Sequence, residues 1–381
     1  MESKQDNKIE ANVELLHQIL KGATGERASD IFFIKEMPLS FKVNGTIVER
    51  GERCLNAGDT ESLVKAMYVM ADNRDFSILK KERDDDFAFS YGEMRFRANT
   101  FVQKGAYCAV LRALSVKIPN PQKMNIPEKI INYAKLKNGL ILITGETGSG
   151  KSTTQACLID YINTHMNKHI ITLEDPVEYV HPKKKSLVTQ REIFTDSNDF
   201  STALKASLRQ CPDVILVGEM RDLETIEVAM SAAETGHLVI STLHTMDAVN
   251  AVGRIIDAFP KDQAAYIATL LSSVLRCVVF QQLIHDVNGN LIPLFEILDV
   301  TDPVRTLVQD ASIKGLRNFI DQSPKQRYTT LDCMLIRLYA EGKIDEATVY
   351  EYGSSHKREW LETNVNAVKR GSLPDYLQIP L

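Results

Sequence analysis

The residues best suited to chemistry form a short glycine-rich stretch, 145–152, which reads GETGSGKS. An apolar run, 140–143, precedes this stretch, and a segment compatible with a helix begins at Thr153. Glycines let the backbone curl so that its N–H groups and the N-terminus of the following helix converge on phosphate oxygens. The sequence therefore predicts a loop that binds the phosphates of a nucleoside triphosphate.

Two side chains of this loop have roles of their own. We expect the Lys151 ammonium to reach the β- and γ-phosphates and the Ser152 hydroxyl to be a ligand of Mg²⁺. The candidate nucleotide-binding residues are Gly145, Thr147, Gly148, Ser149, Gly150, Lys151, Ser152 and Thr153.

A first acidic segment follows the strand-like run 170–173. Its carboxylates are Glu174, Asp175 and Glu178. They are able to bind Mg²⁺, polarise water or pair with an arginine of a neighbouring subunit. A solvated acidic loop is the alternative interpretation, and the phosphate-binding loop elsewhere in the chain favours function.

A second acidic residue, Glu219, follows the apolar run Val214–Val217. A carboxylate delivered at the tip of a buried strand is suited to act as the general base, or to orient water, in attack on a γ-phosphate. The alternative is a carboxylate that only stabilises the start of the next helix through its dipole.

Two histidines, His237 and His244, bracket the run 238–243. Imidazole changes its charge near neutral pH, so either histidine is a candidate catalytic residue. A histidine beside a strand is more often a hydrogen-bonded supporting group than a catalyst, so the residues alone leave both interpretations open.

Composition excludes several classes of protein. With 381 residues and 44% hydrophobic content the chain is long enough for two or three domains with sizeable cores. A net charge of −5 argues against a protein that mainly neutralises nucleic-acid phosphates, so no direct nucleic-acid partner is expected, and the lysines at 183–185 are interpreted as solvated surface.

Cysteines and apolar runs point to a cytoplasmic protein. The six cysteines are scattered without any Cys-x-x-Cys pair, which is typical of reduced thiols rather than of a zinc or disulfide framework. The first ten residues are polar, unlike a signal peptide, and no apolar run approaches the ~20 residues that span a bilayer. We therefore expect a soluble protein.

The first part of the chain predicts an α+β domain over 1–115. Apolar residues at helical spacing up to Leu20 indicate an opening helix that stops at Lys21-Gly22. Strands are expected at 31–34, 39–43, 46–48, 87–91, 95–102 and 109–114, with a hairpin at Asn44-Gly45 and a helix capped at 59–62 that runs to Met70. Three prolines then indicate a linker over 116–127.

The rest of the chain, 128–381, predicts a parallel α/β domain. Strand-like runs at 140–144, 170–173, 214–217 and 238–242 alternate with helical patterns near 152–166, 200–210 and 221–234. Ligands of such sheets bind at the carboxyl ends of the strands, and we expect every candidate residue above to lie there.

Four ordered motifs carry a family resemblance. Segments 145–154, 171–181, 213–226 and 232–245 resemble the Walker A, Asp box, Walker B and His box of the secretion ATPase superfamily, and 254–260 also matches. More narrowly, the chain from Ser29 to Asp332 resembles the PilT family of type IV pilus retraction ATPases, which drive twitching motility. Segment 95–99 resembles the strand that carries arginines of the amino-terminal domain to the nucleotide.

This resemblance implies a fold and a mechanism. The fold class is α/β, a RecA-like P-loop ATPase domain preceded by a smaller α+β PAS-like domain, assembled as a homo-hexamer with ATP and Mg²⁺ between the domains. By carry-over, Glu219 is the catalytic carboxylate, Glu178 and Glu174 form a second acidic set with Glu178 near the metal, and His237 and His244 couple the γ-phosphate to domain geometry. Arg97 and Arg112 are the candidates for charge neutralisation, ahead of Arg95.

The resemblance also implies partners and leaves alternatives open. The expected place is the cytoplasmic face of the inner membrane, on the platform protein of the pilus machinery. A pilus assembly or type II secretion ATPase shares the core, although a further N-terminal domain and a four-cysteine zinc insertion are expected there. A nucleotide-gated scaffold with little turnover is the other alternative. Segment 315–320 matches the retraction motif only in part, so the direction of action stays open.

Overall fold

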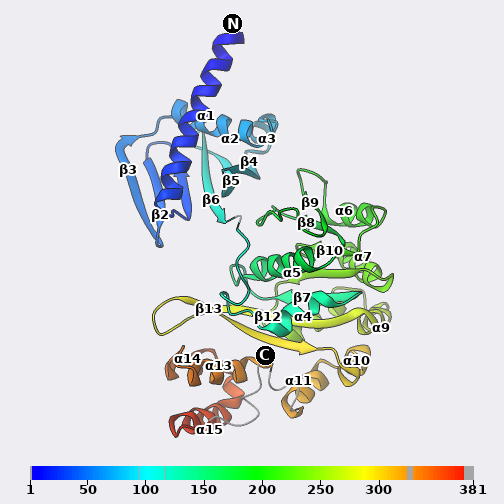
Figure 1. The fold of residues 1–381 in the computed structure, drawn as a ribbon. Helices are drawn as coiled ribbons and strands as arrows, with labels where there is room; N and C mark the ends of the chain where they lie inside the picture. The colour runs from blue at the N-terminus through cyan, green and yellow to red at the C-terminus, as the bar shows by residue number, and fades with distance from the viewer. Residues whose placement is uncertain (1, 93, 116, 324–328, 373–381) are drawn as a thin grey trace. The chain divides into compact units, whose positions relative to one another are not determined.

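The computed structural model describes residues 2–92, 94–115, 117–323 and 329–372. The chain divides into two compact units, Met1–Lys117 with Pro176–Val180, and Ile118–Asp175 with His181–Leu381 (Figure 1). We propose that the domains are 1–115 and 128–381, joined by a linker over 116–127.

The first unit is built on a six-stranded antiparallel sheet in the order β3-β2-β1-β6-β5-β4. Its elements are α1 (Glu2–Gly25), β1 (Asp30–Phe33), β2 (Pro38–Val43), β3 (Thr46–Cys54), α2 (Ala57–Met70), α3 (Ser77–Glu82), β4 (Asp84–Tyr91), β5 (Met94–Gln103) and β6 (Ala106–Ser115). Buried side chains of α1 and α2, such as Leu16 and Met67, pack with Phe33 and Phe96 of the sheet in one core.

Local chemistry fixes the ends of these elements. The predicted hairpin is confirmed, because Asn44 and Gly45 both have positive φ, at 50° and 80°, between paired β2 and β3. The predicted start of α2 was wrong: Asn56 is the N-cap, and Asp59 completes a capping box with it. Helix α1 continues to Gly25, past the predicted stop, because Ala23 is buried in the core.

The second unit contains a seven-stranded sheet in the order β13-β12-β7-β11-β10-β8-β9. Neighbouring strands are parallel except at β12 and β13, which confirms the predicted α/β class. Up to the last strand its elements are α4 (Glu128–Asn132), η1 (Tyr133–Lys135), β7 (Gly139–Thr144), α5 (Lys151–His165), β8 (His169–Glu174), β9 (Leu187–Glu192), α6 (Phe200–Ser207), β10 (Val214–Val217), α7 (Leu223–Glu234), β11 (Leu238–Leu243), α8 (Ala248–Asp257), α9 (Ala264–Val274), β12 (Leu275–His285) and β13 (Leu291–Asp299). The helices after the sheet are α10 (Asp302–Gln309), α11 (Ile313–Gln322), α13 (Leu331–Ala340), α14 (Glu346–Tyr352), η2 (Ser355–Lys357) and α15 (Arg358–Lys369).

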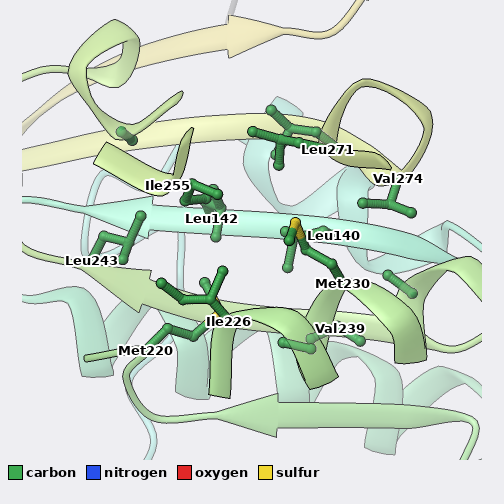
Figure 2. Packing of buried hydrophobic residues seen from close by; sticks show 14 of the residues in the cluster. Leu140, Leu142, Met220, Ile226, Met230, Val239, Leu243, Ile255, Leu271 and Val274 are labelled. Carbon is green, nitrogen blue, oxygen red and sulfur yellow. The ribbon is translucent and has the colours of Figure 1, made fainter. Parts of the chain in front are cut away.

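Alternation along the central strands builds a core on each face of this sheet. Leu140 and Leu142 of β7 lie in one cluster with buried side chains of α6 to α10, and Figure 2 shows them with Met230 of α7 and Leu271 of α9. Ile141 and Ile143 lie in the other cluster, with α4, α5 and the helices from α13 to α15. Strands buried on both faces read as continuous apolar runs, which is why this sheet was recognisable in the sequence.

Parallel pairing brings the carboxyl ends of β7, β11, β10 and β8 to one edge of the sheet. The register pairs Leu243 of β11 with Thr144 of β7, and Val217 of β10 with Leu173 of β8. The loops that follow these strands therefore lie side by side. None of the described helices is long and apolar enough to cross a bilayer.

Candidate nucleotide-binding site

The phosphate-binding loop leaves the sheet at the end of β7. Gly145, Gly148 and Gly150 have φ values of 145°, 82° and 88°, a region that residues with a Cβ rarely adopt. Helix α5 begins at Lys151, earlier than the predicted Thr153, so the lysine opens the helix whose N-terminus faces the loop.

Contacts within the loop fit a polyphosphate ligand. A Cβ on Gly145 would lie 2.1 Å from the Gln281 carbonyl oxygen, so the backbone passes where only glycine fits. The Lys151 Nζ donates to the carbonyls of Gly145 at 2.8 Å and of Glu146 at 2.7 Å, which folds the ammonium over the loop. The buried Ser149 hydroxyl has no hydrogen-bond partner among the described residues. Phosphate oxygens are bound by several hydrogen-bond donors close together and by a positive charge, and the loop provides both.

Glu219 lies at the same edge of the sheet, just after β10. Its side chain is 14% exposed, and its Oε2 accepts from Arg221 Nε at 2.7 Å. His244 Nε2, which follows β11, lies 3.8 Å from the same oxygen. The structure thus places a mostly buried carboxylate between a guanidinium and an imidazole.

The pKa of His244 depends on both Glu219 and Lys151 of the phosphate-binding loop. Burial lowers the pKa of His244 below its ordinary value, the positive charge of Lys151 lowers it further, and the Glu219 carboxylate opposes both. His244 is therefore neutral at physiological pH. Lys151, Glu219 and His244, far apart in sequence, are brought together.

Hydroxyl groups at the strand ends hold these loops in place. Thr144 Oγ1 lies 2.6 Å from Thr245 Oγ1, which connects the loop after β7 to the loop after β11. Thr242 Oγ1 donates to the Gly218 carbonyl at 2.6 Å, which fixes the backbone beside Glu219. These two bonds connect the carboxyl ends of β7, β11 and β10 to one another.

The two residues of the predicted acidic pair, Glu174 and Glu178, belong to different units of the chain. Glu174 ends β8 at the same edge, and its Oε1 accepts from Thr172 Oγ1 at 2.6 Å and from Gln190 Nε2 at 3.2 Å. Glu178 lies in Pro176–Val180, which belongs to the first unit. The structure therefore gives Glu174 a fixed orientation in the second unit.

His237 does not lie where we predicted. It precedes β11, and its backbone carbonyl accepts from Gly139 N at the start of β7, so it lies at the amino edge of the sheet. Its Nδ1 lies 2.9 Å from the Ala232 carbonyl at the end of α7. Because β11 separates the two histidines, the prediction that every candidate lies at the carboxyl edge was wrong for His237.

The arginines of the first unit lie on one face of its sheet. Phe96 and Ala98 of β5 are buried, whereas Arg95 and Arg97 alternate with them, as the sequence predicted. Arg97 pairs across the strands with Arg112 of β6. Arg97 Nε donates to Asp86 at 3.0 Å, and Arg112 Nε donates to Asp30 at 3.0 Å.

Reasoning from the sequence missed two residues of the site. Arg221 follows Glu219 by two positions, and only the fold shows that the two side chains form an ion pair. Gln281 is a buried polar residue within the apolar strand β12. A polar residue in an apolar run is a signal that was available, because buried polar groups need partners.

Magnesium fits this site through few protein ligands. Among residues 2–92, 94–115, 117–323 and 329–372, no group of three or more His, Cys, Asp or Glu forms a metal site. Mg²⁺ beside nucleotides is usually held by one or two side chains and by phosphate oxygens, so a site for it does not require such a cluster. The edge of the sheet has the features of a P-loop nucleotide-hydrolysing domain.

Comparisons with known proteins agree with this class. The model of the family described as Type II/IV secretion system protein matches residues 3–369. Type IV pilus retractation ATPase PilT of Pseudomonas aeruginosa is 36% identical over 88% of this chain and 96% of its own length, and Type IV pilus ATPase PilU of the same organism is 36% identical over 89% and 87%. The crystal structure of the pilus retraction motor PilT with bound ADP has a TM-score of 0.83 and 39% identity over 90% of this chain and 98% of that one.

The chain belongs to the Type II/IV secretion system protein family and, within it, to the PilT family of ATPases. It is a nucleotide-binding P-loop ATP hydrolase.

Proposed function

We propose that this chain is a homo-hexameric motor that hydrolyses ATP to retract type IV pili and so drives twitching motility. The observation that carries the proposal is the joint position of Lys151, Glu219 and His244 at one edge of the sheet, because it combines phosphate binding with a base. The PilT relative, matched over nearly its whole length, supports the retraction role.

The proposed chemistry assigns one task to each group. The loop amides and Lys151 bind phosphate oxygens, and Ser152, with Glu178, holds Mg²⁺, which neutralises charge on the phosphates when it is bound. Glu219 accepts a proton from the attacking water. The Arg221 guanidinium, the ion-pair partner of Glu219, orients this carboxylate.

Other residues are proposed to link the chemistry to motion. Glu174 belongs to the second acidic set, and neutral His244 reports the phosphate state to the loop after β11. Arg97 and Arg112 are proposed to approach the nucleotide from an N-terminal unit, which requires exchange of their bonds to Asp86 and Asp30. His237 lies at the opposite edge of the sheet, and we propose no part for it in the chemistry of its own subunit.

The proposed place of action is the cytoplasmic face of the inner membrane, on the platform protein of the pilus machinery. The identity to PilU, equal to that with PilT, keeps another pilus ATPase role as the second candidate, beside assembly or secretion. A scaffold with little turnover is disfavoured because the carboxylate, the lysine and the imidazole all lie together.

Deletion of the gene tests the direction of action. Excess immobile surface pili would support retraction, whereas loss of pili would indicate assembly. Complementation with Glu219→Gln should leave the excess in place, and the parent gene should remove it. Pili and twitching unchanged by the deletion would contradict the proposed function.

A further inference from the structure

Gln281 occupies an unusual position beneath the phosphate-binding loop. It is 3% exposed and belongs to β12, the strand paired with β7. The last pair of that register joins Phe280 to Thr144, so Gln281 is the next residue along, beside the point where β7 becomes the loop.

The backbone of Gln281 determines the residue at the start of the loop. A Cβ on Gly145 would lie 2.1 Å from the Gln281 carbonyl oxygen, far inside van der Waals contact. This atom belongs to β12, which is paired with β13 at Gln281 and with β7 up to Phe280, so it has little room to move away. The close approach fixes the first glycine of the loop against the sheet.

The side chain of Gln281 contacts the other end of the loop. Its Oε1 accepts from Thr154 Oγ1 at 2.7 Å, and Thr154 is fully buried in the first turn of α5. Its Nε2 would lie 2.8 Å from a Cβ on Gly150, the last glycine of the loop. One residue therefore touches both ends of the loop and the helix that follows it.

Phosphate binding depends on the shape of that loop, since most of its donors are backbone N–H groups. Its glycines are intrinsically free to adopt many conformations, so a support is needed to hold the donors together before phosphate binds. We propose that Gln281 is a positioning residue that holds the loop in its phosphate-binding shape and thereby sets nucleotide affinity. The proposal rests on the proposed function only through nucleotide binding by this loop.

The test uses the full chain with ADP as the ligand. Gln281→Met keeps the length of the side chain and removes the amide, and Gln282→Met makes the same change at the next, half-buried position of β12. We expect Gln281→Met to weaken ADP binding about five- to twentyfold, the effect of one buried hydrogen bond, and Gln282→Met to change it less than about twofold.

A double variant separates positioning from stability. Gln281→Met alone leaves the Thr154 hydroxyl buried without its partner, which also lowers the unfolding temperature without ADP. Adding Thr154→Val removes both partners and should restore most of that stability, because an apolar pair of the same shape is nearly neutral. Affinity should stay low in the double variant, since the loop still lacks its support.

The outcomes are distinct. If ADP affinity returns together with stability in the double variant, or if Gln281→Met binds ADP like the parent, Gln281 is a packing residue and the proposal is wrong. If Lys151→Ala also binds ADP normally, the loop assignment itself fails, which is the failure of the proposed function.

Discussion

The two sheets of this protein differ in where their charged side chains lie and in what these side chains contact. In the seven-stranded sheet Lys151, Glu219 and His244 lie in the loops and helix start at one edge, where the charges of Lys151 and Glu219 act on the His244 imidazole. In the six-stranded sheet Arg97 and Arg112 lie along the strands, and each forms a bond to an aspartate of a neighbouring strand.

The difference follows from strand direction. Parallel strands all end at the same edge, so residues distant in sequence meet in the loops that follow. Antiparallel strands alternate in direction, so contacts are set by cross-strand register, and opposite charges pair locally. A charged residue type therefore acquires its role from the edge or face on which the topology places it.

Lys151→Ala should have the largest effect. The variant removes the loop's own cation, whose charge-assisted hydrogen bonds are worth ~1.5–3 kcal/mol, so nucleotide affinity should fall at least about tenfold and turnover should disappear. Titration with a fluorescent ADP analogue and a phosphate-release assay measure the two quantities.

Lys168→Ala is the matched control for this variant. Lys168 precedes β8 at the amino edge of the same sheet and forms a partly exposed ion pair with Asp213 at 2.7 Å. We expect affinity and turnover within about twofold of the parent, because such surface pairs contribute ~0–1 kcal/mol. If Lys151→Ala and Lys168→Ala lost affinity and turnover equally, the position of a lysine at the carboxyl or amino edge of the sheet would not explain its role in nucleotide binding.

Glu219→Gln should separate binding from hydrolysis. The amide keeps the shape of the side chain and cannot accept the proton of water, so turnover should fall ~10²–10⁴-fold while ATP still binds. Glu224→Gln is the control, because Glu224 lies in the first turn of α7 as an exposed carboxylate paired with Lys205. Normal turnover of the Glu219 variant would reduce that residue to a helix-start charge, and lost binding would make it a structural residue.

Arg97→Ala and Arg112→Ala test whether the six-stranded sheet contributes to chemistry. If either arginine reaches the nucleotide, ATPase activity should fall by up to ~10³-fold in a folded protein. Arg53→Ala is the control, since Arg53 forms a comparable exposed pair with Asp59 in the same unit. Parent-like turnover in both single variants and in the pair would leave these arginines as surface ion pairs.

His244→Asn and His237→Asn give the smallest effects and compare the two edges directly. We expect turnover to fall about tenfold for His244→Asn, as for a residue that assists but does not carry the reaction, and less than about twofold for His237→Asn. A large loss in the His237 variant with normal ADP affinity would indicate that this residue acts on a neighbouring subunit.

The pH dependence of stability should follow His244. Its folded pKa lies below the ordinary 6.5, so as pH falls through that value the unfolded chain takes up a proton that the native protein resists. The contribution of His244 to the free energy of unfolding is therefore present above this pH and is lost below it. The unfolding temperature of the parent should fall more steeply between about pH 7 and about pH 5 than that of His244→Asn. Parallel curves would contradict the depressed pKa.

Much of this protein was readable from the sequence. The loop at 145–152 follows from glycines and a lysine at fixed spacing, and the parallel sheet from apolar runs such as Val214–Val217. Asn44-Gly45 specified its hairpin, because both residues tolerate positive φ. These features depend on neighbours in the chain, so local sequence determined them.

Tertiary structure decided the rest. Strand direction put His244 at the nucleotide edge and His237 at the other, although six residues of one strand are all that separate them. Packing placed Gln281 beneath the loop, and cross-strand register gave Arg97 and Arg112 their acidic partners. Each of these relations joins residues from different strands, and their distances are fixed only when the strands are paired.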